Sequence, residues 1–105
     1  MDAMAIRRLI AEGKYSYSRH AERERQADMS FTYEIEEAFR NCDIIGDYPD
    51  DPRGPSCLIL GFSGQRPLPA VCSIKQNPEE VLLITVYDPS KHPAQRTDRY
   101  QRRRK

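Results

Sequence analysis

The sequence predicts a single α+β domain, in which two or three N-terminal helices pack on an antiparallel sheet of about four strands. Apolar residues recur every three to four positions up to Cys42, and at about every second position after Asp43. Breaker-rich segments separate the later apolar runs, and short loops between consecutive strands favour antiparallel hairpins. The length of 105 residues leaves room for one modest core. We expect the domain to span residues 1–88 and a basic tail to span residues 89–105.

Two segments near the N-terminus have the pattern of short amphipathic helices. In residues 1–12, Ile6, Leu9 and Ile10 share one face, and the glycine at position 13 stops the helix. Ser18 is expected to cap a second helix, which runs from position 19 to about position 28. Between them, residues 15–18 alternate tyrosine and serine, which is typical of an edge strand or an extended lead-in.

A third helix is expected to begin at Ser30 or Thr32 and to end near Asn41. Its apolar stripe consists of residues at i, i+3, i+4 and i+7, namely Ile35, Ala38, Phe39 and Cys42. Glutamates near its N-terminus suit the helix dipole.

Four strands are expected in the second half of the chain, at residues 44–48, 57–62, 68–74 and 81–87. The second is almost continuously apolar, which predicts that it is covered on both faces. Pro69 within the third predicts an edge position or a bulge, because proline donates no ladder hydrogen bond. The fourth is rich in β-branched residues and is the strongest strand candidate.

Composition excludes a membrane protein at this stage. The apolar fraction is 38% and the charged fraction 31%, which is typical of a globular chain. No apolar run approaches the roughly 20 residues that a membrane span needs. The first residues lack the apolar core of a signal peptide, so we expect a cytoplasmic protein.

The net charge of +1 hides an uneven distribution. Residues 22–51 contain ten acids and three bases, and residues 96–105 contain six bases and one acid. The tail, including Arg96 and Arg99, is either a phosphate-binding arm or a solvated terminus. The acidic segment is expected to face away from any RNA, or to dock a basic partner.

The three cysteines do not form a recognisable metal or disulfide pattern. Cys42, Cys57 and Cys72 are an odd number with no C-x-x-C spacing, so we expect buried thiols, no zinc site and no cofactor.

Several segments resemble a known family. Residues 18–21 (SRHA) look like its helix-opening S-x-H-A motif, and residues 45–51 (IGDYPDD) look like its next conserved segment. Residues 52–61, 66–68 and 84–87 continue the likeness. From about position 15 to position 87, the chain therefore resembles domain-of-unknown-function family 4258.

The resemblance implies a fold like that of RelE and barnase, and a toxin of a type II toxin–antitoxin pair. Such a toxin would cleave mRNA, free or on the ribosome, and would bind an antitoxin of zinc-finger or helix-turn-helix type. The chain departs from the family at two places. Residues 22–25 (ERER) interrupt the expected run of arginines, and Pro69 stands where many members carry histidine.

A metal-independent ribonuclease needs a base for the ribose 2′-OH, cations for the phosphate and an acid for the leaving oxygen. His20 is the best base or acid, because histidine exchanges its proton near neutral pH. Arg23 on the same helix face and Tyr87 complete the predicted catalytic set. Arg25 and Arg66, with the two tail arginines, are predicted to contact RNA.

Each of these residues also has a purely structural interpretation. His20 could cap or pack its helix, and Arg23 could belong to a surface salt-bridge lattice. Arg66 could brace a turn, and Tyr87 could be a half-buried strand-end aromatic. The leading hypothesis is an endoribonuclease toxin, and the alternative is a non-catalytic protein-binding module of the same fold. A metal-dependent hydrolase is disfavoured, because the carboxylates and histidines show no ligand spacing.

Overall fold

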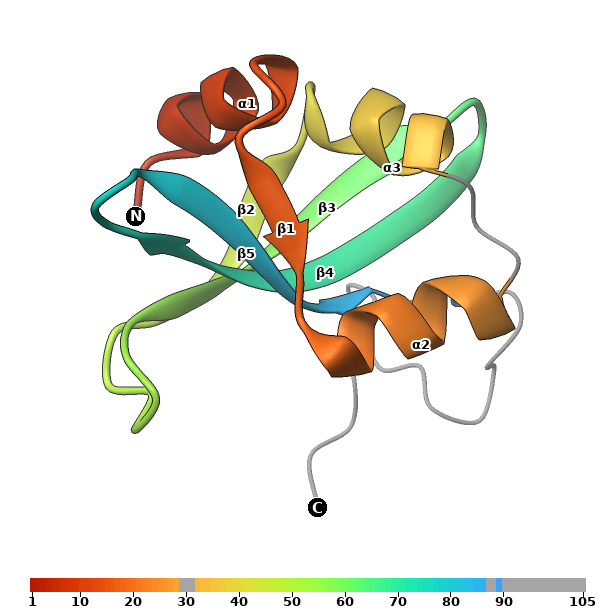
Figure 1. The fold of residues 1–105 in the computed structure, drawn as a ribbon. Coiled ribbons are helices and arrows are strands. Elements are labelled where there is room, and N and C mark those ends of the chain that lie inside the picture. The colour runs from red at the N-terminus through yellow and green to blue at the C-terminus, as the bar shows by residue number, and fades with distance from the viewer. Residues whose placement is uncertain (29–31, 87–88, 90–105) are drawn as a thin grey trace.

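A computed structural model of the chain describes residues 1–28, 32–86 and 89. The sheet has the strand order β1-β5-β4-β3-β2, and only the β1–β5 pair is parallel (Figure 1). The predicted α+β class is confirmed, although the sheet is mixed and has five strands. The elements are α1 (Ala3–Ala11), β1 (Tyr15–Tyr17), α2 (Arg19–Ala27), α3 (Thr32–Phe39), β2 (Asp43–Tyr48), β3 (Ser56–Ser63), β4 (Arg66–Lys75) and β5 (Glu80–Val86).

Strand β1 confirms the edge strand expected at residues 15–18, and in the described part of the chain it makes the sheet five-stranded and mixed where about four antiparallel strands were expected. It is three residues long and pairs in parallel with β5, with Tyr15 opposite Val81 and Tyr17 opposite Leu83. The rule that short loops give antiparallel hairpins applies only to strands that follow each other directly. A parallel pair needs a long crossover, and here almost the whole domain lies between the two strands.

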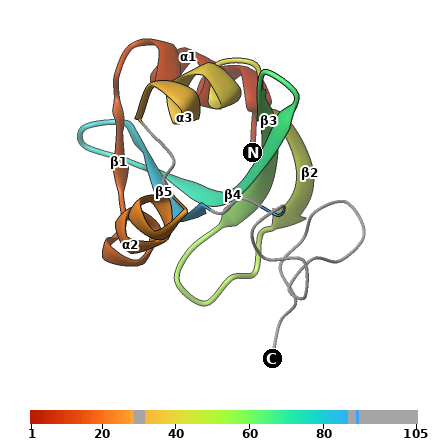
Figure 2. The ribbon, with the colours of Figure 1, turned by 90° about the vertical axis from the view of Figure 1, so that its right-hand side faces the viewer.

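The helices occupy two places on the sheet. Helices α1 and α3 lie side by side, whereas α2 lies apart from them against β5 (Figures 1 and 2). Helix α1 begins after Asp2, whose carboxylate accepts a hydrogen bond from the amide of Met4 at 2.9 Å. Such a cap satisfies one of the free N–H groups at a helix start.

One continuous apolar core joins the helices to the sheet. It contains all three cysteines, the predicted helix stripes and alternate residues of β3, β4 and β5. The tightest contact is at Gly61 of β3, where a Cβ atom would lie 2.0 Å from the carbonyl oxygen of Ala38 in α3. Only glycine therefore allows α3 to pack this closely on the sheet.

The sequence pattern suggested that Pro69 lies in an edge strand or at a bulge. In the structure, Pro69 lies in an internal strand of the sheet. Strand β4 lies between β3 and β5, and Pro69 is opposite Leu60 of β3. Strand β5 ends at Val86, which is opposite Ala70, so within the described residues Pro69 has a strand neighbour on one side only. This arrangement tolerates the missing N–H. A register shift does occur nearby, between Val71 and Cys72.

Strand β3 is covered on both faces only in its first half. Leu58 and Ile59 point to opposite faces and are both buried, but Phe62 near the end of the strand is 49% exposed. The prediction of a strand covered along its whole length is therefore wrong for this end.

Three of the predicted site residues, Tyr87, Arg96 and Arg99, lie outside the described residues, together with most of the expected tail. In the part of the chain that is described, no helix is long and apolar enough to cross a membrane.

We expect the substitution Gly61→Ala to destabilise the fold by about 1–3 kcal/mol, because the added methyl group would overlap the backbone of α3. Urea unfolding followed by circular dichroism measures this free energy. Ser63→Ala, two residues along the same strand, is the matched control and should change it by less than about 0.5 kcal/mol. Equal stability of wild type and Gly61→Ala would contradict the close packing of α3 on β3.

Candidate functional site

Helix α2 is anchored to β5 by the first residue of the S-x-H-A motif. The Ser18 amide donates to the carbonyl of Leu83 at 2.8 Å, and its hydroxyl donates to the carbonyl of Ile84 at 2.7 Å. The same hydroxyl oxygen accepts from the amide of Ala21 at 3.0 Å, which caps the helix. Ala21 is fully buried in the core. Two of the three motif positions therefore serve the fold.

The third position, His20, faces solvent. Its side chain is 61% exposed, and its Nε2 atom lies 3.4 Å from Oε1 of Glu24, one helical turn further on. Glu24 is only 10% exposed, and the same carboxylate oxygen accepts a hydrogen bond from the amide of Val86 at 3.1 Å. The carboxylate is thus fixed between α2 and the end of β5, where it can orient the His20 ring.

Arg23 shares the exposed surface of α2 with His20. It lies three residues after His20, a spacing that places both side chains on one helix face. The predicted salt-bridge lattice is built by a different arginine, since Glu22 pairs with Arg25 and accepts a hydrogen bond from Gln26. A cation next to an exposed histidine is an arrangement that suits a phosphate group.

Arg25 is engaged inside the protein. Its guanidinium donates to Glu22 and lies over the ring of Tyr17, with 5.6 Å between the guanidinium carbon and the ring centroid. The side chain is only 19% exposed. To contact RNA as predicted, the Arg25 guanidinium would have to bind a phosphate group in addition to Glu22 and the Tyr17 ring, or in place of Glu22.

Arg66 occupies the first position of β4 and bridges to α3. Its Nη2 atom lies 3.0 Å from Oε2 of Glu34, and both side chains are mostly buried, at 26% and 16% exposure. The pair ties the β3–β4 turn to the first turn of α3. It therefore braces the fold, as the structural interpretation of Arg66 suggested, and it belongs to a different element from His20.

Two tyrosines of β1 form a bridge between α3 and α2 that the sequence analysis did not identify. The Tyr15 hydroxyl donates a short hydrogen bond to Glu36 of α3. The Tyr15 and Tyr17 rings meet edge to face, with centroids 5.9 Å apart, and Tyr17 carries Arg25 of α2 on its ring. The alternation of tyrosine and serine was the available signal, because it places both rings on one side of the strand.

The environment of this bridge keeps both phenols protonated. Burial, and secondly the hydrogen bond to Glu36, raise the pKa of Tyr15 well above its ordinary value. Burial likewise raises the pKa of Tyr17. The two phenols are therefore hydrogen-bond donors at neutral pH and are not candidate bases.

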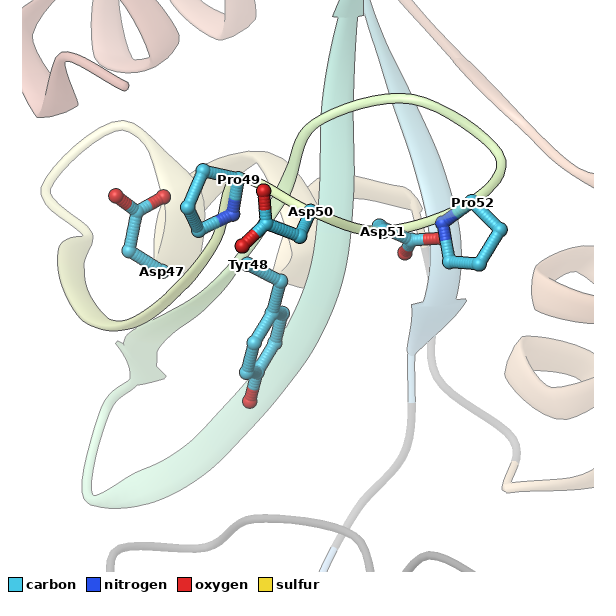
Figure 3. Close-up of a pocket in the computed structure, with 6 residues that line it drawn as sticks. All are labelled: Asp47, Tyr48, Pro49, Asp50, Asp51 and Pro52. Carbon is cyan, nitrogen blue, oxygen red and sulfur yellow. The ribbon is translucent and has the colours of Figure 1, made fainter.

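The turn between β2 and β3 encloses a shallow hollow of about 310 Å³ (Figure 3). Asp51 accepts hydrogen bonds from the side chain and backbone of Arg53 and from the Ser56 hydroxyl, and these hold its pKa well below the usual range. Asp47 and Asp50 are exposed. The hollow lies at the opposite end of β3 from Arg66, and its carboxylates suit a cationic partner better than RNA. It is lined by Asp47, Tyr48, Pro49, Asp50, Asp51 and Pro52.

Among the described residues, no group of three or more His, Cys, Asp or Glu side chains is arranged to hold a metal ion. The chemistry available at α2 is therefore that of the side chains themselves: a histidine, its carboxylate partner and a neighbouring arginine.

Residues 17–88 match the family described as a domain of unknown function (DUF4258), which is more than half of the chain. The chain belongs to this family. No curated protein and no solved structure matches it. The region shared with DUF4258 begins just before the α2 cap and includes His20, Arg25 and Arg66, so these residues belong to the family domain and not to an appended segment.

We expect Ser18→Ala to lower the free energy of unfolding by about 1–2 kcal/mol, since it removes the α2 cap and leaves the Ile84 carbonyl without its donor. Chemical denaturation measures the loss. Ser16→Ala is the matched control, because the Ser16 hydroxyl donates only to Glu80 at the surface, and it should cost less than about 0.5 kcal/mol. Similar losses for both variants would contradict the anchoring role of Ser18.

Stability should fall in alkaline solution through Tyr15. Its pKa is raised in the folded state from an ordinary value of 10.0, so above that pH the unfolded chain loses the phenol proton first. The stabilisation of the folded state by protonated Tyr15 is therefore complete below pH 10, and it is lost as the pH rises toward the folded-state pKa. Urea unfolding at about pH 9 and at about pH 11 measures the free energy of unfolding at each pH. Between these two pH values, this free energy should decrease less for Tyr15→Phe than for wild type. Tyr33→Phe, at an exposed position, should behave as wild type; a decrease in Tyr15→Phe equal to that of wild type would refute the assignment.

Proposed function

We propose that this protein is the toxin of a type II toxin–antitoxin pair and a metal-independent endoribonuclease that acts on mRNA. One observation supports this most directly. Within the S-x-H-A motif, Ser18 and Ala21 are used by the fold, whereas His20 is displayed to solvent beside a nearly buried carboxylate. A histidine held in this way has no evident packing role, and it has the partner that a general acid or base requires.

In this mechanism His20 accepts the proton of the ribose 2′-OH. The resulting oxygen attacks the adjacent phosphorus, and the bond to the 5′-oxygen breaks, which leaves a 2′,3′-cyclic phosphate. The carboxylate of Glu24 stabilises the imidazolium that forms, and Arg23 on the same face neutralises charge on the phosphate. The 5′-oxygen needs a proton from an acid on the other side of the phosphate.

Tyr87 is the proposed acid. It is the next residue in the sequence after Val86, whose amide is bound by Glu24. A phenol donates a proton or a hydrogen bond to a leaving oxygen without a metal. Arg25 and Arg66 are proposed to contact RNA by exchanging their carboxylate partners, Glu22 and Glu34, for phosphate groups, and Arg96 and Arg99 to extend the RNA-binding surface along the basic tail.

The acidic turn supports the proposed antitoxin partner. Its hollow presents Asp47 and Asp50 at the end of β3 that lies away from Arg66. A basic segment of a zinc-finger or helix-turn-helix antitoxin would complement these carboxylates, and long-range attraction would speed its association.

Induced expression in a bacterial host tests the enzyme directly. Wild type should arrest growth, and purified protein should cleave mRNA to products with cyclic phosphate ends. His20→Ala should lower the cleavage rate by about 10²–10⁴-fold, as loss of a general acid or base does. Glu24→Gln should lower it less, because the histidine remains.

Gln26→Ala on the same helix is the matched control and should retain full activity, since Gln26 is exposed and donates only a long hydrogen bond to Glu22. Circular dichroism shows whether each variant is folded. Cleavage by a folded His20→Ala variant at the wild-type rate would refute the catalytic role of the histidine.

A second candidate function is a non-catalytic module that binds a protein. Pro69 stands at a position where many relatives carry histidine, and it is fully buried on the sheet face opposite α3. The chain thus lacks the second histidine that many relatives carry. A stable one-to-one complex with a neighbouring protein, together with no RNA cleavage and no growth arrest, would favour this module.

A further inference from the structure

A group of sulfur atoms lies inside the domain, separate from α2. Cys57 of β3 and Cys72 of β4 are direct partners across the two strands, and their Sγ atoms are 3.7 Å apart. The Sδ atom of Met1 lies 3.4 Å from Sγ of Cys57. Cys57 therefore contacts both a second thiol, from the adjacent strand, and a thioether from a distant part of the chain.

The sulfur group is buried but reaches solvent on one side. Both cysteines have no exposed surface, whereas Met1 is 43% exposed. Met1, which contacts Cys57, is thus the partly exposed member of the group, and its unbranched side chain is flexible.

Thiolate and thioether sulfur are soft donors, and together they select Cu(I) among the biological metals. Zinc sites in proteins are almost always four-coordinate, and no third His, Cys, Asp or Glu joins the pair among the described residues. Three sulfurs bound in a plane at about 2.3 Å from a metal lie about 4.0 Å apart. The separations of 3.7 and 3.4 Å that Cys57 makes with Cys72 and Met1 are shorter than this value by about 0.3 and 0.6 Å, and the flexible Met1 side chain would have to move to complete the triangle with Cys72.

We propose that Cys57, Cys72 and Met1 form a three-coordinate binding site for Cu(I). Binding converts both thiols to thiolates and releases two protons to solvent, while the thioether stays neutral and copper stays in the same oxidation state. The site lies in the core between adjacent strands, so bound copper cross-links β3 and β4 and stabilises the folded state.

Cys42 provides an internal comparison for this site. It is also fully buried, and burial raises the pKa of its thiol to about 11, so it is protonated at neutral pH. It lies three residues after the end of α3, and neither of the two sulfur contacts of Cys57 involves it. The substitution Cys42→Ala therefore removes a buried thiol without removing a proposed ligand.

The test is anaerobic titration of the full chain with Cu(I) in competition with a Cu(I) chelator, after mass spectrometry has verified that Met1 is present. Wild type and Cys42→Ala should bind one equivalent and develop the ultraviolet absorption of a copper–thiolate bond. Cys57→Ala and Cys72→Ala should bind at least about 100-fold more weakly, since loss of a ligand exceeds the effect of losing a supporting residue. Circular dichroism identifies any variant that does not fold.

X-ray absorption of the copper-loaded wild type tests the ligands without any substitution, and should show three sulfur neighbours at about 2.3 Å. Binding of less than one equivalent by wild type would overturn the proposal. So would nitrogen or oxygen neighbours, two sulfurs alone, or equal weakening by Cys42→Ala.

Discussion

The parallel pairing of β1 with β5 is the interaction on which the position of the candidate site depends. Three residues of β1 join the edge of β5, and the Ser18 amide and hydroxyl continue this pairing into the start of α2. Helix α2 therefore begins against β5, and Glu24 is carried to the amide of Val86. His20 acquires its carboxylate partner only as a result of this chain of contacts. A short strand with modest burial thus determines the geometry of the His20–Glu24 pair.

Side chains of different chemical character lie on different elements of the domain. The exposed histidine and Arg23 lie on α2, the carboxylates of the acidic turn lie between β2 and β3, and the sulfur atoms are enclosed between β3 and β4. Arg25 pairs with Glu22 within α2, and Arg66 pairs with Glu34 of α3, which offsets part of the negative charge of each helix. The near-neutral net charge therefore conceals a cationic face on α2 and an anionic turn, and each suits a different kind of partner.

The sequence predicted the helices and later strands well because their periodicities are unambiguous. Each described helix end lies within a few residues of its prediction, and strands β2, β3 and β5 lie where the apolar runs are. It did not predict that β1 pairs in parallel with β5, since nothing local to three residues specifies a partner more than sixty positions away. The position of Pro69 in an internal strand was not predicted from the sequence. One strand can have neighbours on both sides along part of its length and a neighbour on one side along the rest. The tyrosine bridge was missed because the identity of the partner, Glu36, depends on the packing of α3. His20 could be proposed from the sequence because the motif is local, whereas the contact of Glu24 with Val86 depends on the fold.

The attachment of α2 to β5 also bears on synthesis of the protein. The groups that hold the helix in place, the carbonyls of Leu83 and Ile84 and the amide of Val86, belong to the last strand of the sheet. While a ribosome is still translating the chain, residues 80–86 are inside the exit tunnel long after His20 has emerged. The histidine therefore lacks its fixed carboxylate until translation has moved well past β5. The His20–Glu24 pair is thus assembled only after the last strand has joined the sheet.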